Sequence, residues 1–223
     1  MPFGSLLLAI AVTGGFGAVY AAADGPTEPV ASTDFQLETT RPQRGEYHLT
    51  ASETLRVRAE ELLQVLSRSR CRKGCEGFAD HVERDEVLER RDTPRGSWQV
   101  RWTFVDSLLD ASHFSVTEIV REKGRITRRF GTAPEDVIAK WSDEQRPHDP
   151  LFHWQGGTWT LTEKFDVTGR FIHTQVEVEM EMHSERFLIN LAPRRVLAGA
   201  GDHLRTIFGD LRRCQEDPPS PTL

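Results

Sequence analysis

The side chains able to do chemistry include eight histidines, and their spacing predicts no metal site. No two of them have the H-x-H or H-E-x-x-H spacing that brings two imidazoles to one ion. His173 and His183 fall on the polar face of an alternating segment, and His203 projects from a late helix. We therefore expect these histidines to be solvated, with no bound metal and no cofactor.

Asp110, Ser112 and His113 supply the residue types of a hydrolase within four positions. Neighbouring residues on a strand point to opposite faces, and a catalytic triad is defined by geometry rather than by sequence proximity.

Like charges spaced by two on an exposed strand ordinarily solvate a sheet and protect it from aggregation. Three glutamates have that spacing in a later segment: Glu177, Glu179 and Glu181. We expect no catalytic residue and a protein that is not an enzyme.

The three cysteines are Cys71 and Cys75, in the segment CRKGC, and Cys214 near the C-terminus. A disulfide between Cys71 and Cys75 is the simplest pairing, because Gly74 supplies a bend that lets them meet. The alternatives are a bond from Cys214 to either of them, or no disulfide. A metal centre needs further ligands, which C-x3-C alone does not supply.

The first 23 residues read as a targeting signal. Met1–Ala23 carries no ionisable side chain, Leu6–Val12 is apolar, and Ala21–Ala23 offers small residues for signal peptidase. The segment predicts a cleaved signal peptide and export to a periplasm or to the extracellular space. Because the usual Lys or Arg is missing before the apolar run, the alternative is an uncleaved membrane anchor.

The composition is that of one globular domain: 223 residues, 38% hydrophobic and 28% charged. With 28 Lys+Arg against 34 Asp+Glu the net charge is -6, which disfavours nucleic acid as a partner. Residues 24–45 are rich in proline and predict a disordered linker. We assign residues 46–213 to the domain and 214–223 to a disordered tail.

Hydrophobic periodicity predicts an α+β fold. A short strand at 47–51 precedes a helix capped by Ser52, whose apolar stripe runs from Leu55 to Leu66. Alternation then predicts antiparallel strands at 98–104, 114–120, 126–130, 158–165 and 172–183. A helical turn falls at 135–141. A long amphipathic helix at 188–211 follows, started or kinked by Pro193, and it is the late element long enough to cover the sheet.

This plan resembles the START-like (SRPBCC, helix-grip) superfamily, and in particular its START-type lipid-binding domains. The resemblance rests on Gly157, Trp159 and Leu161 in a G-x-W-x-L strand, and on the stretch 187–190 before the last helix. It covers roughly residues 46–213. It implies a curved antiparallel β-sheet wrapped around a long C-terminal α-helix, with a cavity between the two.

The resemblance implies an exported carrier that holds a lipid or another hydrophobic small molecule and makes transient contact with a membrane. The residues expected to line the cavity are those of the apolar faces: Trp98, Val100, Trp102, Phe104, Phe114, Val116, Trp159, Leu161, Val176, Val178, Met180 and Leu204. Two alternatives remain open. One is a cyclase or hydrolase of the same superfamily, and the other is an envelope interaction domain without a cavity.

We predict that the mature chain begins at or just after Ala21–Ala23, because the apolar segment ends there in small residues. N-terminal sequencing of protein recovered from the culture medium or the periplasm measures this. A chain that begins at Met1 and needs detergent for its extraction would establish the anchor instead.

Overall fold

The computed structural model describes residues 10–11, 18–19, 35–67, 82–105, 111–150 and 152–216. The strands are β1 (Ile10–Ala11), β2 (Ala18–Val19), β3 (Gln36–Thr40), β4 (Glu46–Leu55), β5 (Val82–Thr93), β6 (Gly96–Val105), β7 (Ala111–Glu122), β8 (Arg125–Thr132), β9 (Trp154–Phe165) and β10 (Phe171–His183). The helices are α1 (Ala59–Ser67), α2 (Glu135–Trp141), α3 (Phe187–Leu191) and α4 (Pro193–Glu216).

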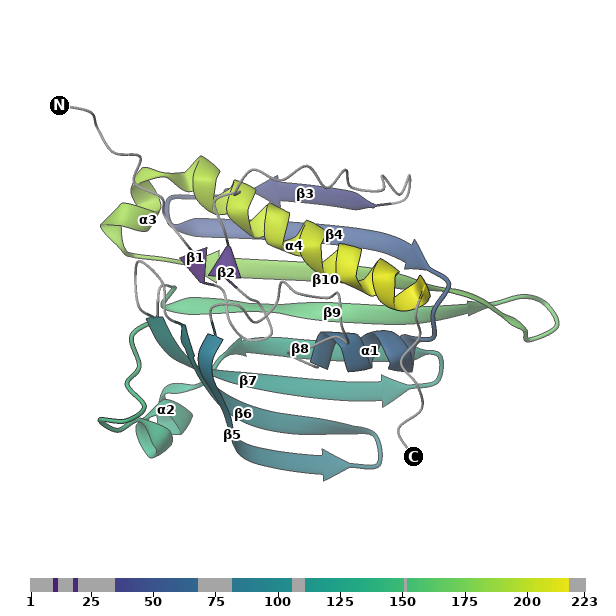
Figure 1. Cartoon of the computed structure of the whole chain (residues 1–223), viewed down its shortest axis with the longest axis horizontal. Coiled ribbons are helices and arrows are strands. Elements are labelled where there is room, and N and C mark those ends of the chain that lie inside the picture. Colours follow the sequence, from purple (N-terminus) through teal and green to yellow (C-terminus); the bar gives the residue numbers. More distant parts are fainter. Residues whose placement is uncertain are drawn as a thin grey trace.

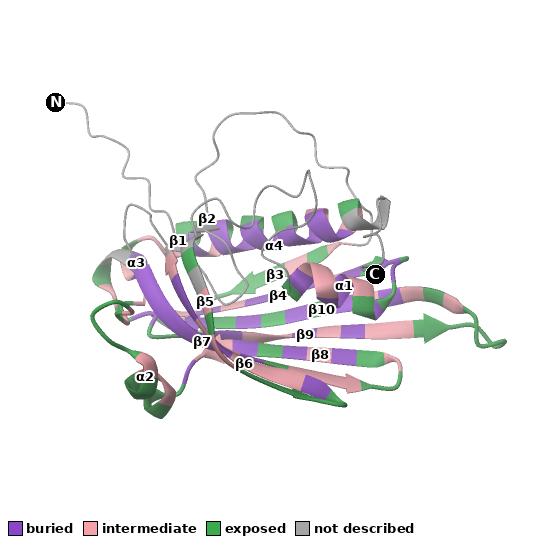
Figure 2. Cartoon of the chain, turned by 60° about the horizontal axis from the view of Figure 1, so that its bottom comes forward, coloured by how far each residue is buried: buried purple, intermediate pink, exposed green. Residues whose placement is uncertain are grey.

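Eight strands form one antiparallel, curved and unclosed sheet in the order β3-β4-β10-β9-β8-β7-β6-β5. Helices α1 and α4 lie on one side of it, which we call the inner face, and α2 lies against the other, the outer face (Figures 1 and 2). Strands β1 and β2 pair with each other and contact α4. The helix-grip architecture predicted from the sequence is confirmed, and Pro193 is the first residue of α4.

Helix α4 is held on the inner face by apolar packing and by ion pairing at one end. The rings of Phe208 on α4 and Trp159 on β9 lie 5.6 Å apart, within one continuous buried cluster. Near the end of the helix, the Arg212 guanidinium donates two hydrogen bonds to the buried carboxylate of Glu53 on β4. Burial of α4 thus depends on the apolar stripe, and the Arg212–Glu53 pair fixes its position along β4.

The ordered sheet begins earlier than the sequence predicts. Within the segment 24–45, expected to be a disordered linker, Gln36–Thr40 forms edge strand β3 and pairs with β4. Most of its side chains are exposed, so it lacks the alternation that identifies a strand. Phe35 and Leu37 nevertheless pack on the core, with the Phe35 and Phe208 rings 5.0 Å apart.

The boundary between the first long strand and the first helix was also predicted wrongly. Strand β4 continues to Leu55, and Ser52 lies inside it rather than at a helix cap. Helix α1 begins at Ala59. The mistake has a physical cause: Leu55 and Ala59 are both buried and four residues apart, so the end of a strand imitated the first turn of a helix.

Several predictions concern residues outside the described part of the chain. Cys71 and Cys75 are among them, as is most of the segment 1–23, so the disulfide and the signal peptide stay predictions. Cys214 lies in α4, which extends to Glu216 and into the segment expected to be a disordered tail. Among the described residues, no helix combines the length and the apolar character needed to cross a bilayer.

Gly157, in the G-x-W-x-L strand β9, is required because the backbone of β10 lies very close to it. A Cβ atom there would lie 2.2 Å from the Glu179 carbonyl oxygen and 2.8 Å from the Phe130 ring, whereas one at Gly209 on α4 would meet nothing within 4 Å. We predict that Gly157→Ala lowers the free energy of unfolding by about 1–3 kcal/mol. Gly209→Ala, the control, should raise it by about 1 kcal/mol through helix propensity.

Equilibrium unfolding in urea measures both changes. Equal effects of the two substitutions would contradict the packing of β9 against β10.

Candidate functional site

The strand registers show which face of the sheet a residue lies on. Two residues that are directly opposed in an antiparallel pair have their side chains on the same face. Trp102 on β6 is opposite Phe114 on β7. From β7 to β4, one row of directly opposed residues follows that same face: Val116, Gly131, Gly156, Glu181 and His48. The aromatic face of β6 and β7 is therefore the outer face, which also carries the glutamates of β10.

Half of the predicted lining residues thus lie on the side of the sheet opposite α4, and the prediction that they face this helix is wrong. They are Trp98, Val100, Trp102, Phe104, Phe114 and Val116. Trp102 and Phe114 form a second small core with Val137, Ile138 and Trp141 of α2, and the Trp102 indole N–H donates to the Pro147 carbonyl at 3.0 Å. Alternation reveals that a strand has two different faces, but it does not say which one meets the helix.

The other half of the predicted set lies on the inner face, buried in the core cluster that α1 and α4 complete. These residues are Trp159, Leu161, Val176, Val178, Met180 and Leu204. Each is at most 2% exposed. The structure therefore brings these six residues together where α4, which carries Leu204, packs on β9 and β10. The thickness of the sheet separates them from the β6–β7 aromatics.

The inner face of β6 and β7 carries a group of buried polar residues, joined by Arg128 of β8, and sequence reasoning missed it. We call this surface the inner polar face: Arg101, Thr103, His113, Ser115, Thr117 and Arg128. All but Arg101 are at most 5% exposed. Among the described residues, the Ser115 hydroxyl oxygen has no hydrogen-bond partner. Alternation alone does not reveal this surface, because buried polar residues carry the same pattern as exposed ones.

Arg128 is the most informative member of the inner polar face. Burial, followed by repulsion from Arg101, lowers the pKa of its guanidinium to about 10. The group therefore keeps its charge at neutral pH. On the inner face it lies between Ile126 and Phe130 of its own strand and opposite Trp159 of β9. Arg128 thus marks the border where a polar inner surface meets an apolar one.

The structure separates the hydrolase-like residues. Ser112 lies on the outer face, where its hydroxyl donates to the Pro147 carbonyl at 2.8 Å and accepts from the Asp149 N–H. His113 points to the inner face opposite Thr103. Asp110 lies outside the described residues. Ser112 and His113 therefore cannot act on one substrate atom, because the sheet lies between their side chains.

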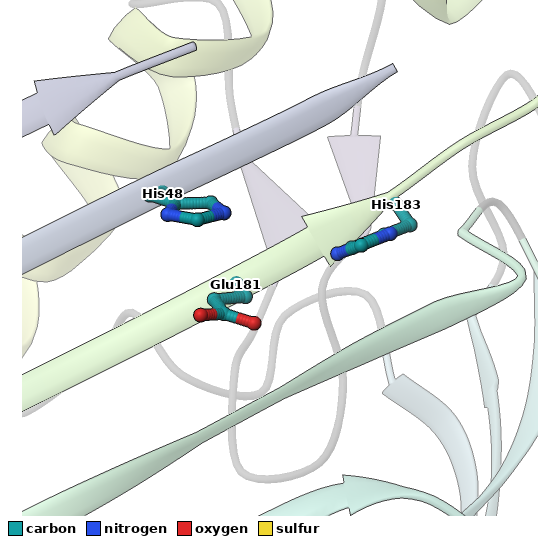
Figure 3. Close-up of side chains that lie close together, drawn as sticks. All are labelled: His48, Glu181 and His183. Carbon is teal, nitrogen blue, oxygen red and sulfur yellow. The ribbon is translucent and has the colours of Figure 1, made fainter. Parts of the chain in front are cut away.

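A cluster of potential metal ligands lies on the outer face, at the end of the row of opposed residues that runs from Val116 to His48. His48 on β4 and Glu181 and His183 on β10 each offer one ligand atom, and these atoms lie within 4.8 Å of one another (Figure 3). The sequence hides this cluster because His48 reaches the other two only through strand pairing. The only local signal is the Glu-x-His spacing of residues 181–183, which is weak by itself.

Comparisons with known proteins identify the fold. No protein-family model and no curated protein sequence matches the chain. Human STARD10 is similar in structure, with a TM-score of 0.51 and 10% sequence identity over 84% of this chain and 76% of that chain. TTHA0849 from Thermus thermophilus gives 0.49 and 12% identity over 78% of this chain and 99% of that one. The likeness to STARD10 shows a START-like fold.

His203 is not solvated, contrary to the sequence prediction. It lies on the buried side of α4 and is 6% exposed. Burial lowers its pKa to about 4 from an ordinary value of 6.5, because the charged imidazolium is poorly solvated there. The prediction failed because α4 is buried over a wider arc than its apolar stripe shows.

We predict that His203 makes the protein less stable in acid. The unfolded chain takes up a proton at this residue near pH 6.5 and the folded chain only near pH 4, so unfolding is favoured as the pH falls through that window. The loss reaches about 3 kcal/mol at most. His203→Gln should remove this part of the pH dependence, measured by urea unfolding between pH 7 and pH 4.

His173→Gln, at a half-exposed site on β10, is the control and should leave the dependence unchanged. If the pH profiles of the parent and His203→Gln coincide, the imidazole is not buried as described.

Proposed function

We propose that this protein is an exported carrier, which encloses an amphipathic molecule with an anionic head group and an apolar body on the inner face of its sheet. The observation that carries the proposal is Arg128, a buried guanidinium at the border of the inner polar face whose pKa is lowered by burial and by repulsion from Arg101. The START-like fold is consistent with a ligand held between the sheet and α4. No covalent chemistry is required of any residue.

The head group is the part of the ligand that the inner polar face would recognise. A carboxylate or phosphate between Arg101 and Arg128 would offset both the desolvation and the mutual repulsion that lower the Arg128 pKa. Guanidinium groups bind such anions through paired hydrogen bonds. Nearby hydroxyls, including that of Ser115, supply further donors. The ligand class is therefore an anionic amphiphile rather than a neutral sterol.

The apolar body would extend from Arg128 toward β9 and β10. Phe130 and Trp159 lie beside Arg128 on the inner face, and Met180 follows on β10. Methionine adapts its shape to different apolar neighbours. Each CH2 group removed from water contributes about 0.8 kcal/mol, so an acyl chain supplies most of the affinity and the arginines supply the selectivity.

We predict that Arg128→Met weakens binding of hexadecanoate at least about tenfold. A hydrogen bond to a charged group contributes about 1.5–3 kcal/mol, and 1.4 kcal/mol corresponds to a factor of ten. Binding of hexadecanol, which has the same chain and no charge, should change much less. Displacement of a fluorescent fatty acid from the purified mature protein measures both affinities, with thermal melts to verify folding.

The matched control is Arg129→Met, one residue away. Arg129 lies on the outer face, where it pairs with Glu118 at 3.2 Å, so its loss should leave both affinities unchanged. If Arg128→Met does not fold, Arg101→Met tests the same head-group site. Equal losses for acid and alcohol would exclude anion recognition, and a parent protein that binds neither would favour the interaction-domain alternative.

A further inference from the structure

Two imidazoles and a carboxylate meet on the outer face, near the end of β10. His48 and Glu181 are directly opposed across the β4–β10 pair, and His183 follows Glu181 by two positions, so that all three side chains share one face. Glu181 is exposed and the histidines are half-buried. Figure 3 shows the three side chains side by side, two from β10 and one from β4.

We propose that His48, Glu181 and His183 bind a divalent transition-metal ion of the zinc type. Two imidazole nitrogens with one carboxylate oxygen suit Zn²⁺, whereas Ca²⁺ and Mg²⁺ prefer oxygen ligands alone. The ligand atoms lie within 4.8 Å of one another. A tetrahedral site with bonds of about 2.1 Å needs roughly 3.4 Å between ligands, which rotations of these partly exposed side chains can reach.

A second carboxylate is placed to orient one of the imidazoles. Glu46 is opposite His183 in the register, and its carboxylate oxygen lies 3.9 Å from the His183 Nδ1 atom. The Gln43 amide donates a hydrogen bond to the same carboxylate. Metal-binding histidines commonly donate their second ring N–H to such a group, which fixes the tautomer and the ring orientation.

The surroundings leave one side of the site open. On its other flank, Glu181 is opposite Gly156, which has no side chain, and the Trp154 ring lies over that glycine and 5.2 Å from the His183 ring. Glu181 and His183 line a groove of about 940 Å3 that extends to α2 and includes His153 and Trp154. Three protein ligands beside an open groove leave a fourth coordination position for water or for a small ligand.

Titration of the untagged full chain with Zn²⁺ tests the proposal, after alkylation of the cysteines so that thiolates cannot bind the metal. We expect one saturable site per chain by calorimetry, and a tetrahedral Co²⁺ absorption spectrum. His48→Ala, Glu181→Gln and His183→Ala should each weaken Zn²⁺ binding at least about tenfold. Thermal melts without metal verify folding, and His48→Gln replaces His48→Ala if that variant does not fold.

Glu179→Gln is the matched control, because it removes the same charge from the same face of β10, two residues away and opposite Thr50. It should bind Zn²⁺ as the parent does. Three results would overturn the proposal: no saturable binding, binding that persists in all three ligand variants, or a loss in Glu179→Gln equal to that in Glu181→Gln.

Discussion

The antiparallel register from β6 to β4, shifted by a bulge between Phe171 and His173 at the start of β10, decides on which side of the sheet each of its side chains lies. Because side chains alternate with a period of two, a slip of one residue in any pair would exchange the two faces of every strand beyond it. The close approach at Gly157 helps to hold this register, since the Glu179 carbonyl leaves no room there for a side chain. The positions of the inner polar face and of the outer histidines both follow from it.

The buried charge of Arg128 is the feature of the inner polar face that bears on function. A buried guanidinium loses hydration, and an apolar residue of similar volume at the same place often gives a protein that is at least as stable. The same sheet has a largely apolar inner surface on β9 and β10, so Arg128 does not reflect a limit of the fold. In the proposed function, a bound anion would offset the desolvation of this charge.

The sequence contains enough to predict the architecture, but it does not show which face of each strand packs against α4. Strand β10 alternates so regularly, and α4 has so continuous an apolar stripe, that both were predicted correctly, as was the antiparallel sheet around the helix. Strand β6 was different, because Trp102 packs under α2 while Thr103 is buried on the inner face. When both faces of a strand are buried, hydrophobicity no longer marks the core, and only pairing with a strand of known orientation assigns the faces.

The two proposed sites lie on opposite faces of one sheet, so they do not share ligands, but β10 contributes residues to both faces. On β10, Met180 and Met182 point to the inner core while Glu181 and His183 point to the outer groove. A metal ion bound by His48 and Glu181 would tie β4 to β10 close to the place where the Tyr47 hydroxyl donates to the Ile189 carbonyl of α3. Since α3 leads directly into α4, an ion there would restrain the strands to which α4 is attached. It would do so from the outer face, although the proposed amphiphile lies on the inner face.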